Sequence, residues 1–170
     1  YKIEFQQDLV DSFNNSGIQK SFMTCPYIIQ ILSMKYNEDK DFKFLDIGGE
    51  NIDFYLILRK KFKNIKYYVY NLKTVLNVLE KIKKKYALNN FFIVNNFSDL
   101  DKIEIDFTNF GSSIQYINNY ENFLTLAMKI SKYIFFSGTS FFQSKNIHFT
   151  KSIVVKQVNV LPDINYLYFF

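Results

Sequence analysis

Apolar residues recur along the chain in two alternating spacings, which predict strands and helices in turn. Short runs of aromatic and β-branched residues, typical of buried strands, cover 42–47, 65–70, 91–94, 103–110 and 133–136. Apolar residues three and four positions apart predict helices over 51–62, 73–86 and 119–132, and another that begins near Cys25-Pro26 and contains Tyr27, Ile28, Ile31, Leu32 and Tyr36. Two further apolar runs, 153–160 and 166–170, flank the turn Leu161-Pro162-Asp163 and predict a closing strand pair.

This alternation of strands and helical segments predicts successive βαβ units. We therefore expect an α/β, doubly wound, Rossmann-like and mostly parallel sheet with helices on both faces. The closing pair is expected to be a C-terminal antiparallel hairpin, which makes the sheet mixed. The domain organisation we expect is an N-terminal helical segment, 1–40, and a Rossmann-like domain, 41–170, within a single globular unit. In such folds ligands bind at the carboxyl ends of the strands.

The net charge of +5 does not by itself indicate a nucleic-acid partner. Arg59 is the single arginine, and specific phosphate and base recognition depends heavily on arginine. The Lys81-Ile82-Lys83-Lys84-Lys85 cluster fits a solvated helix end, where cations face the negative pole of the helix dipole, better than a phosphate-binding patch. We expect no nucleic-acid partner.

Composition also constrains the compartment. With 48% hydrophobic and 22% charged residues the chain is typical of a globular protein, and no apolar run approaches the roughly 18 residues of a membrane span. The mixed first residues do not resemble a signal peptide, and the first residue, Tyr1, suggests that the sequence begins inside a longer chain. A lone cysteine, Cys25, excludes an internal disulfide and suits the reducing cytoplasm. One Cys and one His do not make a structural zinc site, and we expect no metal.

The segment Asp46-Ile47-Gly48-Gly49-Glu50-Asn51 lies where the first strand turns into the next helix. Glycine there allows positive φ and lets the backbone approach a ligand closely, and the helix start behind it offers free N–H groups. An ordinary tight turn has the same composition, because two glycines do not make a G-x-G-x-x-G fingerprint. Its place after the first strand of a βαβ series favours a cofactor turn.

Three segments resemble the class I S-adenosylmethionine-dependent methyltransferases, and more narrowly a group of methyltransferases often associated with cell-surface polysaccharide loci. The first is the glycine turn Leu45-Asp46-Ile47-Gly48-Gly49. The second is Phe107-Thr108-Asn109-Phe110-Gly111-Ser112-Ser113-Ile114-Gln115-Tyr116-Ile117, and the third runs from Val155-Lys156-Gln157-Val158 to Tyr166-Leu167-Tyr168-Phe169-Phe170. The resemblance covers roughly residues 40–170. It implies S-adenosylmethionine as cofactor and a small-molecule or carbohydrate acceptor, in polysaccharide biosynthesis for the narrower group.

The resemblance also implies roles for individual positions. Asp46, Gly48, Gly49 and Glu50 form the turn beside the methionine part of the cofactor. Asn71 stands where the family usually has an acidic residue that holds the ribose hydroxyls. The positions near the adenine would be Asn96, Phe97 and Ser98. Those facing the methionine end and the acceptor would be Asn109, Phe110 and Gly111.

The sequence departs from the family at three of its functional segments. Glu50 and Ile52 occupy the region of the third glycine, Asn71 replaces the acid, and Ser137-Gly138 stands where the narrower group has an Asp-Arg pair. These departures support an alternative hypothesis, a degenerate methyltransferase-fold domain that acts as an interaction module without catalysis. A dinucleotide-dependent oxidoreductase is disfavoured, because its glycine fingerprint and the acidic residue after the second strand are both missing.

Candidates for catalysis are few. Methyl transfer needs mainly alignment of donor and acceptor, and a base helps only where the acceptor loses a proton. Gln115, Tyr116 and His148 are the polar residues expected near the mouth of the site. Tyr116 fits packing as well as positioning, and His148 fits a plain surface histidine in a loop better than a base.

Overall fold

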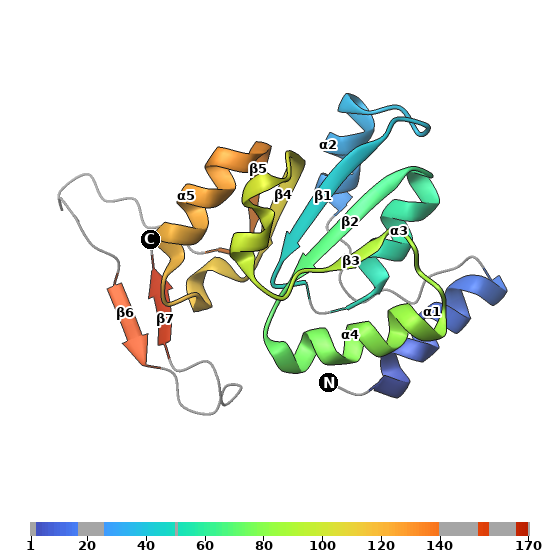
Figure 1. Cartoon of the computed structure of the whole chain (residues 1–170), viewed down its shortest axis with the longest axis horizontal. Helices are drawn as coiled ribbons and strands as arrows, with labels where there is room; N and C mark the ends of the chain where they lie inside the picture. The colour runs from blue at the N-terminus through green and yellow to red at the C-terminus, as the bar shows by residue number, and fades with distance from the viewer. Residues whose placement is uncertain (1–2, 17–25, 50, 140–152, 157–165, 170) are drawn as a thin grey trace.

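The computed structural model describes residues 3–16, 26–49, 51–139, 153–156 and 166–169. Seven strands and seven helical segments lie within these ranges (Figure 1). The strands are β1 (Phe42–Ile47), β2 (Ile65–Tyr70), β3 (Phe91–Ile93), β4 (Ile105–Gly111), β5 (Ser131–Ser137), β6 (Ile153–Lys156) and β7 (Tyr166–Phe169). The helices are α1 (Ile3–Ser16), α2 (Pro26–Lys35), α3 (Asp53–Lys61), α4 (Lys73–Lys85) and α5 (Tyr120–Ile130), with short 3-10 helices η1 (Phe97–Lys102) and η2 (Ile114–Tyr116).

The first five strands form one sheet in the order β3-β2-β1-β4-β5, and every pair in it is parallel. The chain winds outward from β1 to β3 and then returns to start the other half at β4. The predicted α/β, Rossmann-like parallel sheet is therefore confirmed. The strand order reverses between β1 and β4, so the connections that follow these two adjacent strands leave in opposite directions. Ligands of such sheets bind at this topological switch point.

The mixed sheet expected from the closing strands is wrong. β6 and β7 pair with each other in an antiparallel register and form a separate two-stranded sheet, while the five-stranded sheet contains parallel pairs alone. Two strands that pair locally satisfy their backbone hydrogen bonds on the shared edge without joining a larger sheet. The predicted turn at Leu161-Pro162-Asp163 lies outside the described residues.

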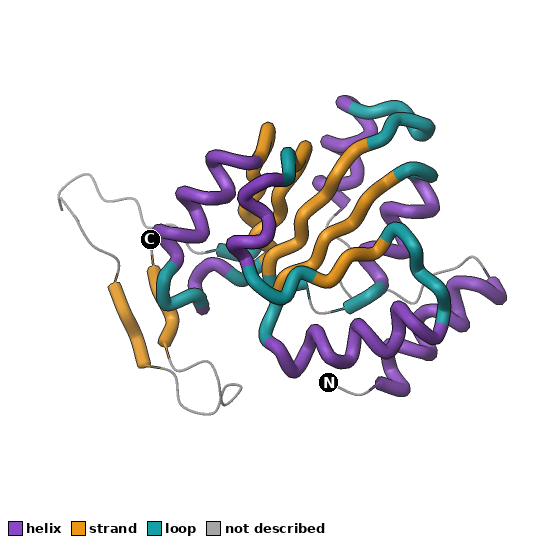
Figure 2. The backbone as a smooth tube through the Cα atoms, viewed as in Figure 1, coloured by secondary structure: helices purple, strands orange, loops and turns teal. Residues whose placement is uncertain are grey.

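Helices cover both faces of the sheet, as predicted (Figure 2). Successive side chains of a strand point to opposite faces, so β1 sends Phe42 and Phe44 into one core and Leu45 and Ile47 into the other. The first core also takes buried residues from α1, α2, α3 and α4, whereas the second takes them from α5, η1 and η2. The two helices before β1, α1 and α2, thus pack on the first of these two cores.

A row of aromatic rings crosses the first face from strand to strand. Phe107, Phe44, Tyr67 and Phe91 are register partners on four adjacent strands, with ring centroids 5.5, 5.3 and 5.6 Å apart along the row. All four side chains are almost fully buried. The high aromatic content of the chain therefore serves the core here. The Tyr67 hydroxyl extends from this row toward the carboxyl edge, where it donates a hydrogen bond to Asp46 of β1.

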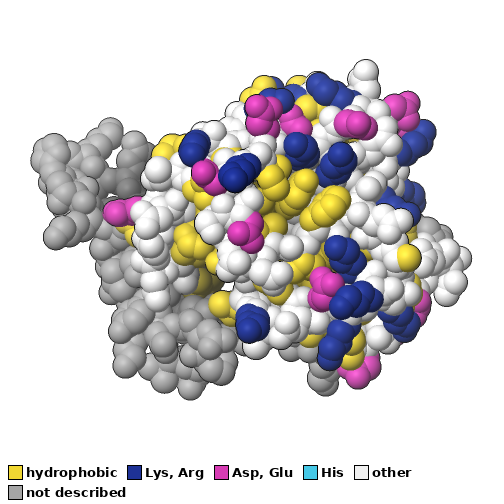
Figure 3. Space-filling model, in the orientation of Figure 1, with side chains coloured by type: hydrophobic (Ala, Val, Ile, Leu, Met, Phe, Trp, Pro, Cys, Tyr) yellow, Lys and Arg dark blue, Asp and Glu magenta, His cyan; other side chains and the backbone are white. Residues whose placement is uncertain are grey.

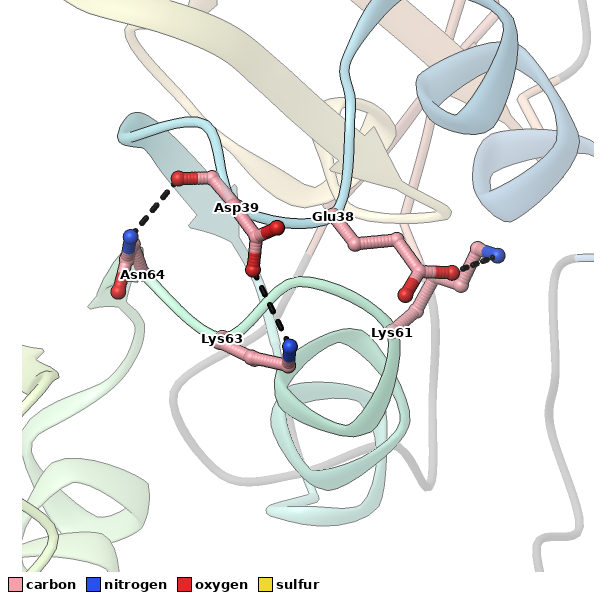
Figure 4. A network of polar contacts seen from close by, with 5 residues as sticks. All are labelled: Glu38, Asp39, Lys61, Lys63 and Asn64. Carbon is pink, nitrogen blue, oxygen red and sulfur yellow. Dashed lines mark hydrogen bonds and ion pairs between the residues drawn. The ribbon is translucent and has the colours of Figure 1, made fainter.

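Charged side chains gather at the opposite edge, where β1 and β2 begin. Glu38 pairs with Lys61 at 2.6 Å, Asp39 pairs with Lys63 at 3.1 Å, and Asn64 donates to the backbone carbonyl of Asp39 at 2.8 Å (Figure 4). These groups are exposed, and exposed ion pairs contribute at most about 1 kcal/mol each. The network joins the two loops before the strands and lies far from the carboxyl edge.

Lysine and acidic side chains are interspersed over the face of the molecule shown in Figure 3. The Lys83, Lys84 and Lys85 cluster occupies the last turn of α4, the helix end predicted for it. Within the described part of the chain, no helix has the length and apolar character of a membrane span.

Candidate functional site

A cavity of about 1190 Å³ opens at the carboxyl edge of the five-stranded sheet. Its wall is built from the segments that follow all five strands, and β1 and β4 meet at its centre. Seven of the residues predicted for a cofactor line this cavity: Asp46, Gly48, Gly49, Asn71, Asn96, Asn109 and Gly111. Glu50 lies outside the described residues.

The two glycines after β1 are required by what surrounds them. Gly48 has φ of +85°, and a Cβ there would lie 2.2 Å from Cβ of Ser113. A Cβ on Gly49 would lie 2.2 Å from Oδ2 of Asp46. The Ser113 hydroxyl donates to the carbonyl of Ile47 at 2.6 Å, so the segment after β4 fastens the turn after β1. The turn therefore holds bare backbone against the cavity.

A buried polar cluster lies beneath the turn. Asp46 accepts hydrogen bonds from the Tyr67 hydroxyl at 2.5 Å and from Nδ2 of Asn109 at 2.8 Å. Burial raises the pKa of Asp46 to about 6, although the hydrogen bonds from Tyr67 and Asn109 act in the opposite direction. Burial and the adjacent Asp46 raise the pKa of Tyr67 well above 10.0, so the phenol stays protonated.

Asn109 leaves one atom of this cluster unsatisfied. Its Oδ1 is buried, and among the described residues it has no hydrogen-bond partner. A buried acceptor without a partner costs about 1–3 kcal/mol. Asp46 and Asn109 both line the cavity, so a bound group that carries N–H or O–H donors would be complementary to this corner.

The side chain of Asn71 makes hydrogen bonds to the protein backbone. Its Nδ2 donates to the carbonyl of Gly49 at 2.9 Å, and its Oδ1 accepts the N–H of Leu72 at 2.6 Å. The side chain thereby ties the glycine turn to the start of α4. It still lines the cavity, where each amide atom retains a second hydrogen-bonding position.

The residues predicted for the adenine end are only partly on the cavity wall. Asn96 lines it, but Phe97 and Ser98 are not among the lining residues. Phe97 stacks against Phe123 of α5 at 4.3 Å and contacts Tyr70 at 5.3 Å, and these two partners do line the cavity. The ring of Phe97 therefore supports the wall from behind.

Phe110 and Gln115 also lie behind the cavity wall. Phe110 is fully buried in the second core and stacks on Phe136 at 5.2 Å, because β4 alternates its side chains between the two faces. Gln115 donates to the carbonyl of Gly138 at 3.3 Å and accepts from the Thr139 hydroxyl at 3.2 Å, which ties η2 to the end of β5.

Of the remaining catalytic candidates, Tyr116 lines the cavity. His148 lies outside the described residues. In the described ranges no group of three or more His, Cys, Asp or Glu residues is placed to hold a metal ion.

Sequence reasoning missed several residues that build the site. Asn51 lines the cavity and is held by Gln6 of α1, 45 positions earlier in the chain. Ser113 and Phe123 act through tertiary contacts with the turn and with Phe97. Asn51 alone had a local signal, because it follows the glycine turn at the start of a predicted helix.

Comparison with known proteins gives a fold assignment. No protein-family model matches the chain, and no curated protein matches it. The structure is similar to the N-terminal domain of EvdMO1, solved in the presence of SAH and D-fucose, with a TM-score of 0.64 and 13% identity over 97% of this chain and 79% of that one.

Two further similar structures are methyltransferases. A SAM-dependent methyltransferase from Aquifex aeolicus gives a TM-score of 0.51 and 14% identity over 78% of this chain and 68% of that one. Coclaurine N-methyltransferase, bound to N-methylheliamine and SAH, gives a TM-score of 0.52 and 15% identity over 80% of this chain and 44% of that one. At such identities the similarity shows the fold alone, which is the Rossmann-like α/β fold of methyltransferases.

Proposed function

We propose that this chain is an S-adenosylmethionine-dependent methyltransferase that acts on a small or carbohydrate-like acceptor. The observation that carries the proposal is the corner of the cavity formed by Asp46 and Asn109 beside the bare glycine turn. It lies at the switch point of a fold that the chain shares with the EvdMO1 domain solved in the presence of SAH and with SAH-bound coclaurine N-methyltransferase.

The chemistry of this corner fits the amino-acid part of the cofactor. An ammonium group donates three hydrogen bonds and carries a positive charge, so it would satisfy both the Asp46 carboxylate and the unpartnered Oδ1 of Asn109. Gly48 and Gly49 leave room for the ligand to pass close to the backbone. A neutral hydroxyl would satisfy Oδ1 without matching the charge of Asp46.

The rest of the cavity offers positions for the other parts. Asn71 lies where β2 ends and would face the ribose, and Asn96 lies where β3 ends and would face the adenine. Ligand pockets commonly measure about 300–1,000 Å³, so a cavity of about 1190 Å³ has room for a cofactor together with a small acceptor. Three residues that carry hydroxyl groups, Ser112, Tyr116 and Ser137, line the wall at the ends of β4 and β5, where the acceptor would lie.

The cofactor, when bound, supplies a methyl group on a positively charged sulfonium. The protein's part is to hold the acceptor in line with that group, and such alignment accounts for much of the rate of a bimolecular transfer. Tyr116 is the residue we propose to orient the acceptor. A carbohydrate acceptor is supported by the hydroxyl-rich wall and by the sequence segments that resemble methyltransferases of polysaccharide loci.

Isothermal titration calorimetry with S-adenosylhomocysteine tests the proposal. We expect saturable binding at one site, weakened at least about tenfold by Asp46→Asn, which removes a charged partner. Asp106→Asn is the matched control, because it removes a half-buried carboxylate at the opposite edge of the sheet. Absence of binding at millimolar S-adenosylhomocysteine overturns the proposal and favours the interaction-module alternative.

Transfer itself requires a second measurement. A panel of monosaccharides and small hydroxylated compounds, incubated with methyl-labelled S-adenosylmethionine, should give a labelled product for at least one acceptor. Tyr116→Phe should lower transfer while leaving S-adenosylhomocysteine binding unchanged.

A further inference from the structure

A buried glutamine of α1 holds the segment between the glycine turn and α3. Gln6 is fully buried, and its Oε1 accepts the backbone N–H of Ile52 at 2.9 Å. Its Nε2 donates to Oδ1 of Asn51 at 2.8 Å. Ile52, the N-cap residue of α3, makes no side-chain cap hydrogen bond of its own, and Gln6 binds the backbone N–H of Ile52 from 46 positions away.

These two hydrogen bonds fix the orientation of two amides in succession. The N–H of Ile52 can act as a donor and not as an acceptor, so the oxygen of Gln6 must face it. The nitrogen of Gln6 then faces Asn51, and Asn51 must turn its oxygen toward Gln6. Its NH₂ group, with two N–H donors, is left for whatever binds in the cavity that Asn51 lines.

We infer that Gln6 is a positioning residue that fixes Asn51 as a hydrogen-bond donor to the carboxylate of the cofactor's amino-acid part. The inference rests on the proposed function. Two N–H donors suit a carboxylate, and the start of α3 beside them adds the positive end of a helix dipole. Asp46 and Asn109 present acceptors to the same cavity.

The cavity therefore carries donors and acceptors that match the two ends of a zwitterion. Asp53, in the first turn of α3, also lines this cavity, and its negative charge opposes an anionic ligand. Its Oδ1 accepts the N–H of Phe54 at 2.8 Å, so the helix start partly offsets its charge. The NH₂ group of Asn51 is then the group that decides whether a carboxylate is accepted.

Comparison of two ligands separates this role from a merely structural one. S-adenosylhomocysteine carries the amino-acid part, whereas 5′-methylthioadenosine has the adenosine and lacks the carboxylate. Gln6→Glu keeps an acceptor for the Ile52 N–H but loses the N–H that Gln6 donates to Asn51. The side-chain amide of Asn51 must then turn over, with its NH₂ group toward residue 6 and its oxygen toward the cavity. We expect S-adenosylhomocysteine to bind this variant at least about tenfold more weakly, with the affinity for 5′-methylthioadenosine changed less than twofold.

Three further variants keep the test decisive. Gln6→Met is neutral and similar in length, and it should lower the same selectivity without any added charge. Gln7→Glu places the charge on the neighbouring residue of α1, which is only half-buried, and should leave the selectivity unchanged. Asn51→Asp keeps the acceptor for Gln6 at a half-exposed position and should lose selectivity even if Gln6→Glu fails to fold.

The outcomes are distinguishable. Equal weakening of both ligands in the Gln6 and Asn51 variants overturns the inference, as does unchanged binding of both, while the proposed function stands. If the wild-type protein binds 5′-methylthioadenosine and not S-adenosylhomocysteine, the donor assignment and the proposed cofactor both fail. If it binds neither, the proposed function fails and takes this inference with it.

Discussion

Replacement of Asp46 by asparagine should stabilise the protein at alkaline pH. Asp46 is buried, and in the described part of the chain its charged form accepts hydrogen bonds from Tyr67 and Asn109, both of which are neutral. Asp46→Asn removes the charge and keeps an oxygen that can accept from the Tyr67 hydroxyl. The amide of Asn109 can then turn, and its Oδ1 receives an N–H from the new side chain.

The magnitude follows from the pKa of Asp46. Burial raises it from 3.8 to about 6, so between these pH values the folded protein binds a proton that the unfolded chain has lost. The free energy of unfolding therefore falls as pH rises through this window. At 1.36 kcal/mol per pH unit the complete loss in the wild type is about 3 kcal/mol, of which about 2 kcal/mol falls between pH 4 and pH 8.

Urea denaturation of the wild type and Asp46→Asn at pH 4, 5, 6, 7 and 8 measures this difference directly. All other titrating groups are common to both proteins, so the difference between the two free energies of unfolding isolates Asp46. The free energy of unfolding of the variant should rise relative to that of the wild type by about 2 kcal/mol from pH 4 to pH 8. Parallel curves for the two proteins would refute the assignment of a raised pKa to this carboxyl.

Tyr67→Phe should change the pH dependence of the free energy of unfolding in the opposite direction to Asp46→Asn. The Tyr67 hydroxyl donates to Asp46 and lowers the pKa of that carboxyl, so its removal should raise the pKa further. The free energy of unfolding of the wild type minus that of the variant should then grow between about pH 6 and pH 8, because the carboxylate has lost a hydrogen-bond donor. A constant penalty at every pH would indicate only the loss of a buried hydroxyl.

Three further outcomes are expected. S-adenosylhomocysteine should bind more tightly as pH rises through about 6, since the anionic form of Asp46 pairs with an ammonium, and calorimetry of Asp46→Asn should lack this rise. Gly49→Ala should cost about 1–3 kcal/mol in thermal unfolding, because its Cβ would lie 2.2 Å from Oδ2 of Asp46. Ser113→Ala should cost about 1 kcal/mol in urea denaturation through loss of the bond to the carbonyl of Ile47, whereas a neutral result would mean that a water replaces the hydroxyl.

The central strands could be predicted from sequence because their burial leaves an unbroken apolar signal. The predicted strands 42–47 and 65–70 coincide with β1 and β2. The apolar pattern is interrupted at the edge of the sheet, where β5 begins at Ser131 and includes the exposed Lys132. The pattern therefore assigns both residues to the preceding helix, 119–132. An edge strand has less burial to impose a pattern, and polar residues are tolerated at its start.

The site was predictable as far as topology fixes it. Strand ends meet at one edge of a parallel sheet, so Asp46, Asn71 and Asn109 could be placed around one cavity from their positions in the sequence. Orientation across the strand was the harder part. Phe110 follows Asn109 directly, and the alternation of the strand sends it into the second core.

Gln6 could not be predicted at all. A glutamine on an amphipathic helix reads as a surface residue, and its burial depends on how α1 packs against α3 and α4. Tyr86, at the end of α4, also binds α1, with its hydroxyl donating to Asp11 at 2.8 Å. Contacts between segments so distant in sequence follow from the tertiary fold and leave no periodic trace.

The acceptor at Asn109 and the donor at Asn51 are each fixed by a group that has a single hydrogen-bonding role, the Asp46 carboxylate and the backbone N–H of Ile52. A carboxylate can only accept, so Asp46 forces Asn109 to donate and leaves the oxygen of Asn109 over as an acceptor. A backbone N–H can only donate, so Ile52, acting through Gln6, leaves the NH₂ group of Asn51 over as a donor. The first arrangement depends on pH, because protonated Asp46 can itself donate to the amide of Asn109. The second does not, and acidification through about pH 6 should therefore weaken ammonium recognition while the donor at Asn51 stays in place.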